Sequence, residues 1–272
     1  MTDLDQRSFD DIDTSKPHPA RMYDFYLQGK DYYEADELAA ANVEVVFPTI
    51  KITARTNRQF MHRATRWLAS EAGIRQFLDI GTGIPTRPNL HQVAQEIAPD
   101  AHVVYADYDP IVLRHAEALM RSTPEGRTAY IQADVRQPET ILSAGKLHET
   151  LDLTRPVALS LNALLHFVPD ESDPYGIVER LMDALPSGSY LALSHCTPDF
   201  APEMWEKVAQ VYRAGGIPLQ VRSKEDVRRF FDGYELVEPG LTVPHLWRPD
   251  GESVEGATDA AVSIYAAVAR KL

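Results

Sequence analysis

Hydrophobic positions change their spacing along this chain, and the change divides it into three parts. The first 18 residues are acidic and polar and lack the apolar core of a signal peptide, which predicts a flexible tail at 1–18. Over 19–72 apolar residues recur at helical spacing without strand-like alternation, which predicts an N-terminal helical cap or lid. From residue 73 onward short apolar runs alternate with helical stretches, so we expect one larger domain over 73–272.

Five short apolar runs in this larger domain are separated by stretches of helical periodicity. The predicted strands cover 76–80, 102–107, 129–133, 157–162 and 189–195. The predicted helices between them cover 90–97, 111–120, 138–144 and 175–184. Strands that alternate with helices form parallel βαβ units with right-handed crossovers. The run VALSL, which has little polar alternation, is typical of a sheet covered on both faces.

The last part of the chain breaks this alternation. Two helical stretches, 205–215 and 224–231, precede two apolar segments at 234–238 and 260–269. The connection between those segments is rich in glycine and proline, which disfavour a helix. We therefore predict an α/β fold whose mostly parallel sheet ends in an antiparallel pair of strands.

Composition and charge narrow the classes of partner. The chain has 272 residues, of which 44% are hydrophobic and 25% charged, as is ordinary for a globular protein. Its 27 basic and 40 acidic residues give a net charge of −13, which disfavours nucleic acid and anionic membranes as partners. Because Cys196 is the only cysteine, no intrachain disulfide can form and a reducing, cytoplasmic location is expected. The sequence shows neither a membrane-spanning apolar run nor zinc-ligand spacing, so we predict no membrane association and no metal site.

The turn after the first predicted strand carries the strongest chemical signal. Residues 77–83 read FLDIGTG, in which an acid is followed by Gly81 and Gly83 before a helix. Glycine suits such a turn because a Cβ would obstruct the close approach of the backbone to a ligand. By itself, however, a GxG pair predicts only a strand-to-helix turn.

Polar residues end each of the first four predicted strands. Asp79 lies at the end of the first strand and Asp107 ends the second, near the spacing expected for a carboxylate that binds ribose hydroxyls. Asp134 follows the third strand, where it could accept a hydrogen bond from an adenine amine, and Asn162 ends the fourth. Each residue alone is more often a helix cap. Since the carboxyl ends of parallel strands meet at one edge, the four together predict a nucleoside site.

Two features distinguish S-adenosylmethionine from a nicotinamide dinucleotide as the ligand. Thr86 stands where GxGxxG would place its third glycine, which lets the helix pack closely under a pyrophosphate. Asp79 also brings a negative charge to the turn, which suits an ammonium group and repels a pyrophosphate. We therefore favour S-adenosylmethionine as cofactor. An NAD(P)-binding oxidoreductase and a cofactor-binding regulatory protein remain as alternatives.

The motifs taken together resemble those of class I methyltransferases. FLDIGTG resembles the first motif, VVYADYDP the second, and AYIQADV and LSLNALLHFVPD the third and fourth. With SKPHPARMYDFYLQGKD near the start and PHLWRPD near the end, nearly the whole chain resembles an actinobacterial S-adenosylmethionine-dependent methyltransferase family, long catalogued as a domain of unknown function. The resemblance implies a Rossmann-like fold with a seven-stranded, mostly parallel sheet and an antiparallel last strand.

The same resemblance implies which residues bind the cofactor. The acid at 79 would face the methionine amino group, those at 107 and 109 the ribose and adenosine, and the residues at 134 and 135 the adenine. The residues at 162 and 163 would border the methionine part and the methyl group. The implied set is Asp79, Gly81, Thr82, Gly83, Asp107, Tyr108, Asp109, Asp134, Val135, Asn162 and Ala163.

The predicted cap has polar residues that invite a functional interpretation. Arg21, Tyr23 and Tyr26 lie about one turn apart and can share a helix face. As part of a lid, Arg21 would bind the methionine carboxylate and a tyrosine would pack on the ligand. The alternative is an amphipathic helix that packs its aromatic residues on the larger domain. Arg55, Asn57 and Arg58 pose the same question, and we expect at least one of them on a solvated face.

Methyl transfer is an in-line displacement that depends mainly on proximity and alignment. A base is required only when the acceptor must lose a proton. His166, just beyond the fourth strand, is the first candidate and His195, at the end of the fifth, is the second; either could instead be structural. No motif names the acceptor, but the negative charge and the apolar LLHFV segment favour a small molecule over nucleic acid.

Overall fold

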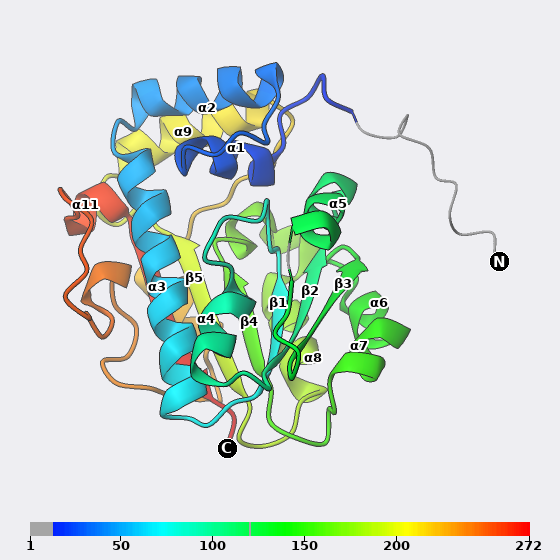
Figure 1. Ribbon diagram of the computed structural model, residues 1–272. Helices are drawn as coiled ribbons and strands as arrows, with labels where there is room; N and C mark the ends of the chain where they lie inside the picture. The colour runs from blue at the N-terminus through cyan, green and yellow to red at the C-terminus, as the bar shows by residue number, and fades with distance from the viewer. Residues whose placement is uncertain (1–12, 120) are drawn as a thin grey trace.

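A seven-stranded sheet forms the centre of the computed structural model, which describes residues 13–119 and 121–272 (Figure 1). The strands are β1 (Gln76–Ile80), β2 (His102–Asp107), β3 (Arg127–Gln132), β4 (Ala158–Asn162), β5 (Tyr190–Cys196), β6 (Glu235–Leu236) and β7 (Ile264–Arg270). Their order is β3-β2-β1-β4-β5-β7-β6. The first five strands are parallel, and β7 pairs antiparallel with both β5 and β6. The predicted mostly parallel sheet with an antiparallel last strand is confirmed.

Alternation along the strands builds two apolar layers. In β1, Leu78 and Ile80 join the cluster on one face while Phe77 joins the cluster on the other, because successive side chains of a strand point to opposite faces. Helices α3 (Ile50–Ser70) and α4 (Leu90–Ile97) cover the Phe77 face. Helices α6 (Pro138–Leu142), α7 (Gly145–Thr150), α8 (Pro174–Asp183) and α10 (Lys224–Arg229) cover the other. Helix α5 (Pro110–Leu119) packs beside β2 and β3.

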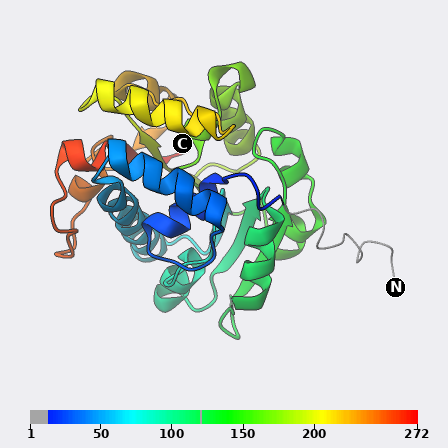
Figure 2. The same ribbon diagram turned by 90° about the horizontal axis from the view of Figure 1, so that it is seen from above.

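A separate layer of three helices lies over the carboxyl ends of the strands (Figures 1 and 2). It consists of α1 (Pro19–Tyr26), α2 (Glu34–Val46) and α9 (Pro202–Ala214), and we call it the cap. Helix α2 packs against both α1 and α9. The buried side chains of Met22, Val43, Phe47, Trp205 and Val208 form its apolar centre.

The cap differs in extent from the helical segment predicted over 19–72. Helix α3 begins beside the cap, where Ala54 joins its apolar cluster, and continues along the sheet, where Phe60 and Leu68 join the sheet cluster. Helix α9, from the far end of the sequence, completes the cap instead. The division of the chain into domains stays a prediction.

Local signals explain where the cap helices begin and end. The His18 ring accepts a hydrogen bond from the Ala20 N–H, and Pro19 occupies the first position of α1, where no N–H is needed. Asp36 receives the backbone N–H of His18 at 2.8 Å and that of Tyr33 at 2.9 Å, so one carboxylate ties the starts of α1 and α2 together.

The two ends of the chain depart from the predicted elements. Residues 1–12 of the predicted tail lie outside the described residues, whereas residues 15–18 line the main cavity. The segment predicted as a strand from residue 260 begins as helix α11 (Asp259–Val262), because Thr258 caps it by accepting a hydrogen bond from the Ala261 N–H. The described residues also form the short 3₁₀ helices η2 (Leu165–Phe167), η3 (Asp170–Ser172) and η4 (Pro244–Leu246). Among the described helices, none is long and apolar enough to cross a membrane.

Candidate functional site

A cavity of about 1010 Å³ lies between the cap and the carboxyl ends of β1 to β4. Strand β1 lies between β2 and β4, so the chain reverses its direction of travel through the sheet at this point. Open α/β sheets bind their ligands at such a reversal. The volume lies at the upper end of the range for small-molecule sites, about 300–1,000 Å³, which leaves room for more than one small molecule.

Most of the predicted cofactor residues converge on this cavity. Those that line it are Arg21, Tyr23, Tyr26, Asp79, Gly81, Thr82, Gly83, Asp107, Tyr108, Asp134, Val135, Asn162 and Ala163. Asp109 lies just outside the lining. Its carboxylate accepts the Ile111 N–H at 2.9 Å and lies 3.2 Å from Nδ1 of His18, so it supports the start of α5 and the entry to α1.

The glycine turn is tied to the neighbouring strand. Gly81 and Gly83 have φ angles of 74° and 67°, in the left-handed region that favours glycine. A Cβ at Gly81 would lie 2.6 Å from Cδ1 of Leu164, so this position also lacks space for a side chain. The Gly83 N–H donates to Oδ2 of Asp107 at 2.9 Å. The turn and the end of β2 therefore form one unit.

Two carboxylates at the strand ends, that of Asp107 buried and that of Asp79 half-buried, have raised pKa values despite their hydrogen bonds. Burial raises the pKa of Asp79 to about 6, although Ser160 and Arg58 oppose the shift. Burial also raises the pKa of Asp107 to about 6, against hydrogen bonds from the backbone of Asp109 and Gly83. A cation bound beside either group would favour its charged form and lower the pKa again. The rim of the sheet is therefore suited to a positively charged ligand.

The end of β4 has a buried oxygen with nothing bound to it. Asn162 donates from Nδ2 to Oγ of Ser160 at 2.8 Å, but its Oδ1 has no hydrogen-bond partner within the described part of the chain. Buried polar atoms in folded proteins are nearly always satisfied. Because Asp79 pairs in register with Ser160, this oxygen lies on the strand next to that carboxylate. A ligand with an ammonium group fits both acceptors.

The predicted adenine residue Asp134 is already paired in the described structure. Nε of Arg136 donates to its Oδ2 at 2.9 Å, and the Arg136 N–H donates to its Oδ1 at 2.9 Å. Burial alone would raise the pKa of Asp134, but these hydrogen bonds lower it below its usual value. Asp134 therefore stays ionised and retains lone pairs for a further donor.

Arg21 and Arg58, two of the three arginines in the described lining, occupy different parts of the cavity. Nε of Arg21 lies 3.3 Å from Oδ1 of Asp36 and 4.0 Å from Oδ2 of Asp109, which places the guanidinium between α2 and the start of α5. Arg58 lies instead by Asp79, whose negative charge acts on it, and it donates to the carbonyl oxygens of Thr86 and Pro88. Arg58 thus lines the cavity beside the end of β1, a position the sequence pattern could not assign to it.

Arg55 and Asn57, the other polar residues in question on α3, have opposite environments. Arg55 is exposed and donates to Gln28, as expected for a solvated face. Asn57 is buried and joins a chain of hydrogen bonds across the site. Its Nδ2 donates to the Tyr23 hydroxyl at 3.0 Å and its Oδ1 accepts from Oγ of Ser194 at 2.6 Å. Ser194 in turn accepts the Ala163 N–H at 2.9 Å, so the cap is linked to the end of β4.

His166 lines the cavity as a neutral ring. Its Nδ1 accepts the backbone N–H of Cys196 at 3.4 Å, so the ring proton lies on Nε2, which is 4.0 Å from the Cys196 sulfur. Burial, and then the nearby His195 and Arg222, lower the pKa of His166 well below its usual value. The side chain can therefore donate a hydrogen bond from Nε2 into the cavity, but it does not carry a charge near neutral pH.

His195 does not reach the cavity, contrary to its place as the second candidate base. Its Nε2 accepts from Nη1 of Arg222 at 2.8 Å, and its Nδ1 donates to the Cys196 carbonyl oxygen at 2.7 Å. Burial lowers its pKa to about 3. The ring is withdrawn because the last residues of a fully buried strand alternate between the two faces, and position 195 points toward Arg222 and Phe230.

Metal ligands do not gather at the strand ends. Within residues 13–119 and 121–272, no group of three or more His, Cys, Asp or Glu side chains is arranged to hold a metal ion.

Comparison with known proteins identifies closely similar chains. The family model described as S-adenosyl methyltransferase matches residues 5–272. A DUF574 family protein from Streptomyces avermitilis MA-4680 is 52% identical, with a TM-score of 0.93 over 96% of this chain and 99% of that one. A candidate methyltransferase from Thermobifida fusca YX is 41% identical, with a TM-score of 0.87 over 95% of this chain and 96% of that one. Among proteins with curated functions, none matches.

Proposed function

The chain belongs to the S-adenosyl methyltransferase family, and we propose that it transfers a methyl group from S-adenosylmethionine, held along the strand ends, to a small molecule held under the cap. Membership of this family makes the protein an S-adenosylmethionine-dependent methyltransferase and decides against a nicotinamide-dependent oxidoreductase. The predicted resemblance to an actinobacterial family is confirmed by the relatives from Streptomyces and Thermobifida. What we propose beyond family membership is the class of methyl acceptor and the role of each residue in the site.

The observation that carries the cofactor assignment is the pair of acceptors at the ends of β1 and β4. Burial raises the pKa of the Asp79 carboxylate to about 6 although Ser160 is hydrogen-bonded to it, and Oδ1 of Asn162 is buried without a donor in the described chain. An ammonium group suits both at once, because it supplies a positive charge and several N–H donors. Gly81 and Gly83, in the turn after β1, have no side chain that would keep a ligand away from the backbone.

The remaining cofactor contacts follow the order of the strands. Asp107 accepts one backbone N–H on each carboxylate oxygen, which orients both oxygens and leaves lone pairs for ribose hydroxyls. Tyr108, Asp134 and the amide of Val135 lie along the cavity beyond it and would hold the adenosine. These assignments retain the roles that the family resemblance implied.

The methionine carboxylate is better matched by Arg58 than by Arg21. Arg21 is engaged by the carboxylates of Asp36 and Asp109. Arg58 lies beside Asp79, and its guanidinium makes its described hydrogen bonds only to backbone carbonyl oxygens. We therefore assign Arg21 to holding the cap in place near the adenosine and Arg58 to the carboxylate.

The chemistry requires alignment more than proton transfer by the protein. When bound, S-adenosylmethionine supplies a sulfonium methyl group, which an acceptor atom takes as the carbon–sulfur bond breaks and sulfur keeps the electron pair. The cap lies over the cavity, and Asn162 and Ala163 line it where they would border the methyl group. We propose that His166 donates a hydrogen bond from Nε2 to the acceptor and acts neither as base nor as cation. His195 receives no catalytic role.

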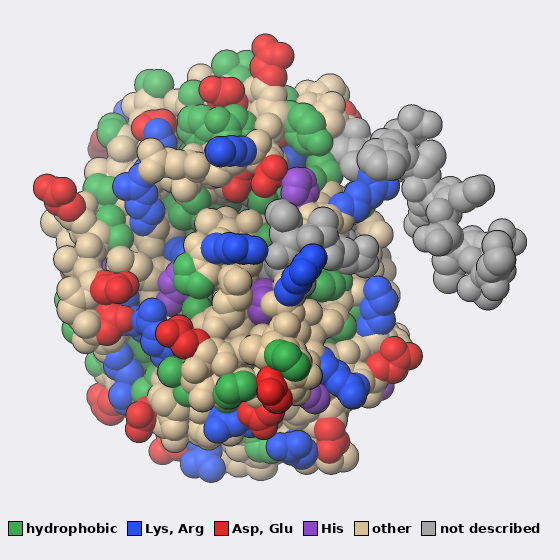
Figure 3. All heavy atoms as spheres, viewed as in Figure 1, with side chains coloured by type: hydrophobic (Ala, Val, Ile, Leu, Met, Phe, Trp, Pro, Cys, Tyr) green, Lys and Arg blue, Asp and Glu red, His purple; other side chains and the backbone are tan. Residues whose placement is uncertain are grey.

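The surface supports a small molecule as the acceptor. On the face shown in Figure 3, acidic and basic side chains are interspersed rather than separated into patches of one sign. With a net charge of −13, the protein would repel nucleic acid at long range. A cytoplasmic location remains the prediction from the single cysteine.

Calorimetric titration with S-adenosylmethionine, S-adenosylhomocysteine and NAD tests the proposal directly. We expect the first two to bind and NAD not to bind. Asp107→Asn removes one charge and one hydrogen-bond acceptor. It should lower the affinity for S-adenosylhomocysteine at least about tenfold, as expected for the loss of a hydrogen bond to a charged group. Asp232→Asn is the matched control, since Asp232 is an exposed acid outside the cavity lining. Binding of NAD alone, or equal weakening by both variants, would overturn the assignment.

A further inference from the structure

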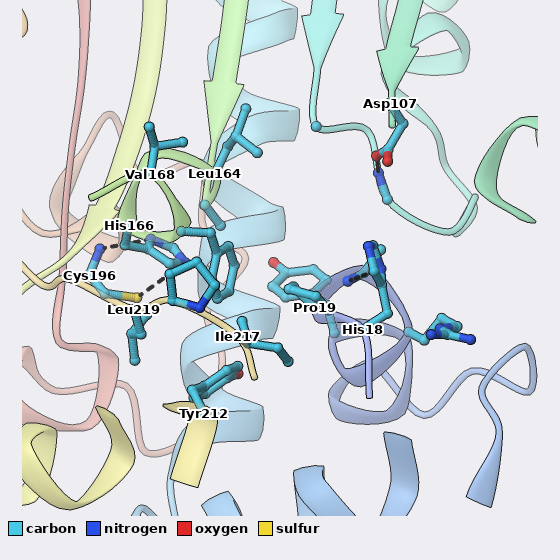
Figure 4. Close-up of a pocket in the computed structure, with 18 of the residues that line it drawn as sticks. His18, Pro19, Asp107, Leu164, His166, Val168, Cys196, Tyr212, Ile217 and Leu219 are labelled. Carbon is cyan, nitrogen blue, oxygen red and sulfur yellow. Dashed lines mark hydrogen bonds between the residues drawn. The ribbon is translucent and has the colours of Figure 1, made fainter. Parts of the chain in front are cut away.

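The cavity has two ends with opposite chemistry. In Figure 4, Asp107 and His18 lie at one side, while Leu164, Val168, Ile217, Leu219 and Tyr212 gather at the other with His166 and Cys196. We define the apolar end by six side chains that line it and belong to one apolar cluster with the cap: Tyr26, Phe167, Trp205, Tyr212, Ile217 and Leu219. They come from α1, η2, α9 and the segment that follows α9.

Charged side chains in the described lining belong to the other end. They are Asp13, Lys16, Arg21, Arg58, Asp79, Asp107, Asp134 and Arg136, and all lie in the entry to α1, in α1, in α3 or at the ends of β1 to β3. Helix α9, η2 and residues 215–219 contribute no charged side chain to the described lining. One end of the cavity is therefore lined by charged side chains and the other end by uncharged ones.

The titratable groups at the apolar end are all uncharged near neutral pH. Burial lowers the pKa of His166 and raises the pKa of Cys196, Tyr26 and Tyr212. An ion bound among these side chains would lose its hydration without gaining a counter-charge, which is costly. A neutral molecule with apolar surface pays no such penalty and gains from leaving water.

We propose that the apolar end binds the methyl acceptor, and that the acceptor is an uncharged, largely apolar molecule such as an aromatic one. The inference rests on the proposed function, since it assumes that the cofactor fills the charged end. The aromatic side chains of Tyr26, Phe167 and Tyr212 line this end and match a flat ring, because rings pack well edge to face and offset.

A few polar atoms at the apolar end determine which hydrogen-bonding groups the methyl acceptor can carry. The hydroxyls of Tyr26 and Tyr212, from two different cap helices, are 3.5 Å apart. Nε1 of Trp205 is buried and has no partner within the described residues, and an indole N–H can only donate. With Nε2 of His166, these atoms offer mainly donors. The acceptor molecule therefore presents a hydroxyl, carbonyl or ring-nitrogen lone pair to this wall.

A matched pair of probes tests the inference: 2-naphthol, which is neutral at pH 7, and 2-naphthoate, which has the same ring system and a negative charge. Each is titrated calorimetrically into the protein saturated with S-adenosylhomocysteine. We expect 2-naphthol to bind at least about tenfold more tightly, a difference of roughly 1.4 kcal/mol. Equal binding, a preference for 2-naphthoate, or no binding of 2-naphthol would overturn the inference.

Variants locate the binding and separate the two proposals. Leu219→Asp, at a partly exposed position of the wall, should abolish the preference for 2-naphthol, whereas Leu246→Asp, exposed and outside the lining, should not. Tyr212→Phe preserves the ring and should weaken 2-naphthol about fivefold by removing one hydrogen bond. If S-adenosylhomocysteine binds but neither wall variant changes 2-naphthol binding, the acceptor assignment fails alone. If S-adenosylhomocysteine itself does not bind, the proposed function fails.

Discussion

The strand ends and the cap face each other across one cavity, but they are built in different ways. The strand ends follow one another along the chain and are held by hydrogen bonds between neighbouring strand ends, such as the bond from the Gly83 N–H to the Asp107 carboxylate. The cap joins helices from opposite ends of the sequence, α1 and α9, through apolar side chains. The strand ends thus hold polar atoms in fixed positions, which suits a cofactor whose structure does not vary. The cap can change its lining through a few apolar substitutions without disturbing the sheet.

The largest expected effect comes from weakening the cap. Phe47 is fully buried and packs edge to face on Trp205, with ring centroids 5.4 Å apart. Phe47→Ala should lower the free energy of unfolding by about 3–5 kcal/mol, the usual cost of truncating a buried phenylalanine. Leu38→Ala on the exposed side of α2 is the control and should change it by less than about 0.5 kcal/mol. Denaturant unfolding measures both, and similar values would show that the cap is not held by this apolar centre.

A smaller effect is expected from crowding the glycine turn. Gly81→Ala adds a methyl group in the left-handed region and against Leu164, which should cost about 1–3 kcal/mol and weaken S-adenosylhomocysteine. Gly240→Ala has the same backbone strain, with φ of 83°, but nothing within 4 Å of the added Cβ. The difference between the two variants in thermal unfolding isolates the contact with Leu164. Equal losses of stability would mean that backbone strain alone, and not the contact with Leu164, makes glycine necessary at position 81.

The raised pKa of the strand-end carboxylates predicts pH-dependent cofactor binding. Below about pH 6 Asp79 becomes protonated in the free protein, and the ammonium group loses its counter-charge. The affinity for S-adenosylhomocysteine should therefore rise about tenfold from pH 5 to pH 6.5 and level off above that. Asp79→Asn should bind more weakly and show a flatter profile, measured by calorimetry at each pH. A profile unchanged by the substitution would exclude Asp79 as the titrating group.

The same shift predicts how stability changes with pH in the absence of cofactor. Since burial raises the pKa of Asp79 and Asp107 above the unfolded value, the folded state binds more protons between about pH 4 and pH 6. The stability that the protonated forms of Asp79 and Asp107 contribute to the folded state is therefore fully present at about pH 4. It is lost as the pH rises through about 6. Asp79→Asn and Asp107→Asn should therefore each flatten the curve of stability against pH, while Phe47→Ala, which removes no titratable group, should only lower it.

The smallest effect concerns the hydrogen bonds that join the cap to the strand ends. Tyr23→Phe removes the hydroxyl that bonds Asn57 and the Ala54 carbonyl oxygen, which should cost about 1 kcal/mol in the free energy of unfolding. A double-mutant cycle with Asn57→Ala measures the coupling between the two residues, expected at about 0.5–1 kcal/mol. A coupling of zero would show that the cap and the strand ends are independent after all.

Sequence patterns predicted the parallel strands and the helices between them well, and the last two strands less well. The five parallel strands were located because their apolar runs are short, continuous and bounded by polar ends. The segment from residue 260 was predicted as a strand, but Thr258 caps a short helix there before β7 begins. Strand β6 is two residues long, since Pro239 follows soon after and lacks an N–H for the sheet.

Among the residues of the site, those at the strand ends were also predicted better than those on helix α3 and at the end of β5. Asp79, Asp107, Asp134 and Asn162 were placed together because parallel strands bring their carboxyl ends to one edge, whatever the rest of the chain does. Asn57 and Arg58 were left undecided, because the helical pattern alone could not tell which face of α3 meets the cavity. His195 was expected near the site and lies behind it, because Arg222 occupies the space beside it.

The sequence by itself determined the order of strands and helices, the glycine turn and the polar residues at the strand ends. These depend on local spacing and on a general rule of parallel topology, so they need no knowledge of distant contacts. Only the tertiary structure decided that α9 completes the cap, that Arg58 rather than Arg21 lies beside Asp79, and that one end of the cavity has no charge in its described lining. Such features arise when segments far apart in the chain bury their apolar faces together, and no local pattern specifies which faces will meet.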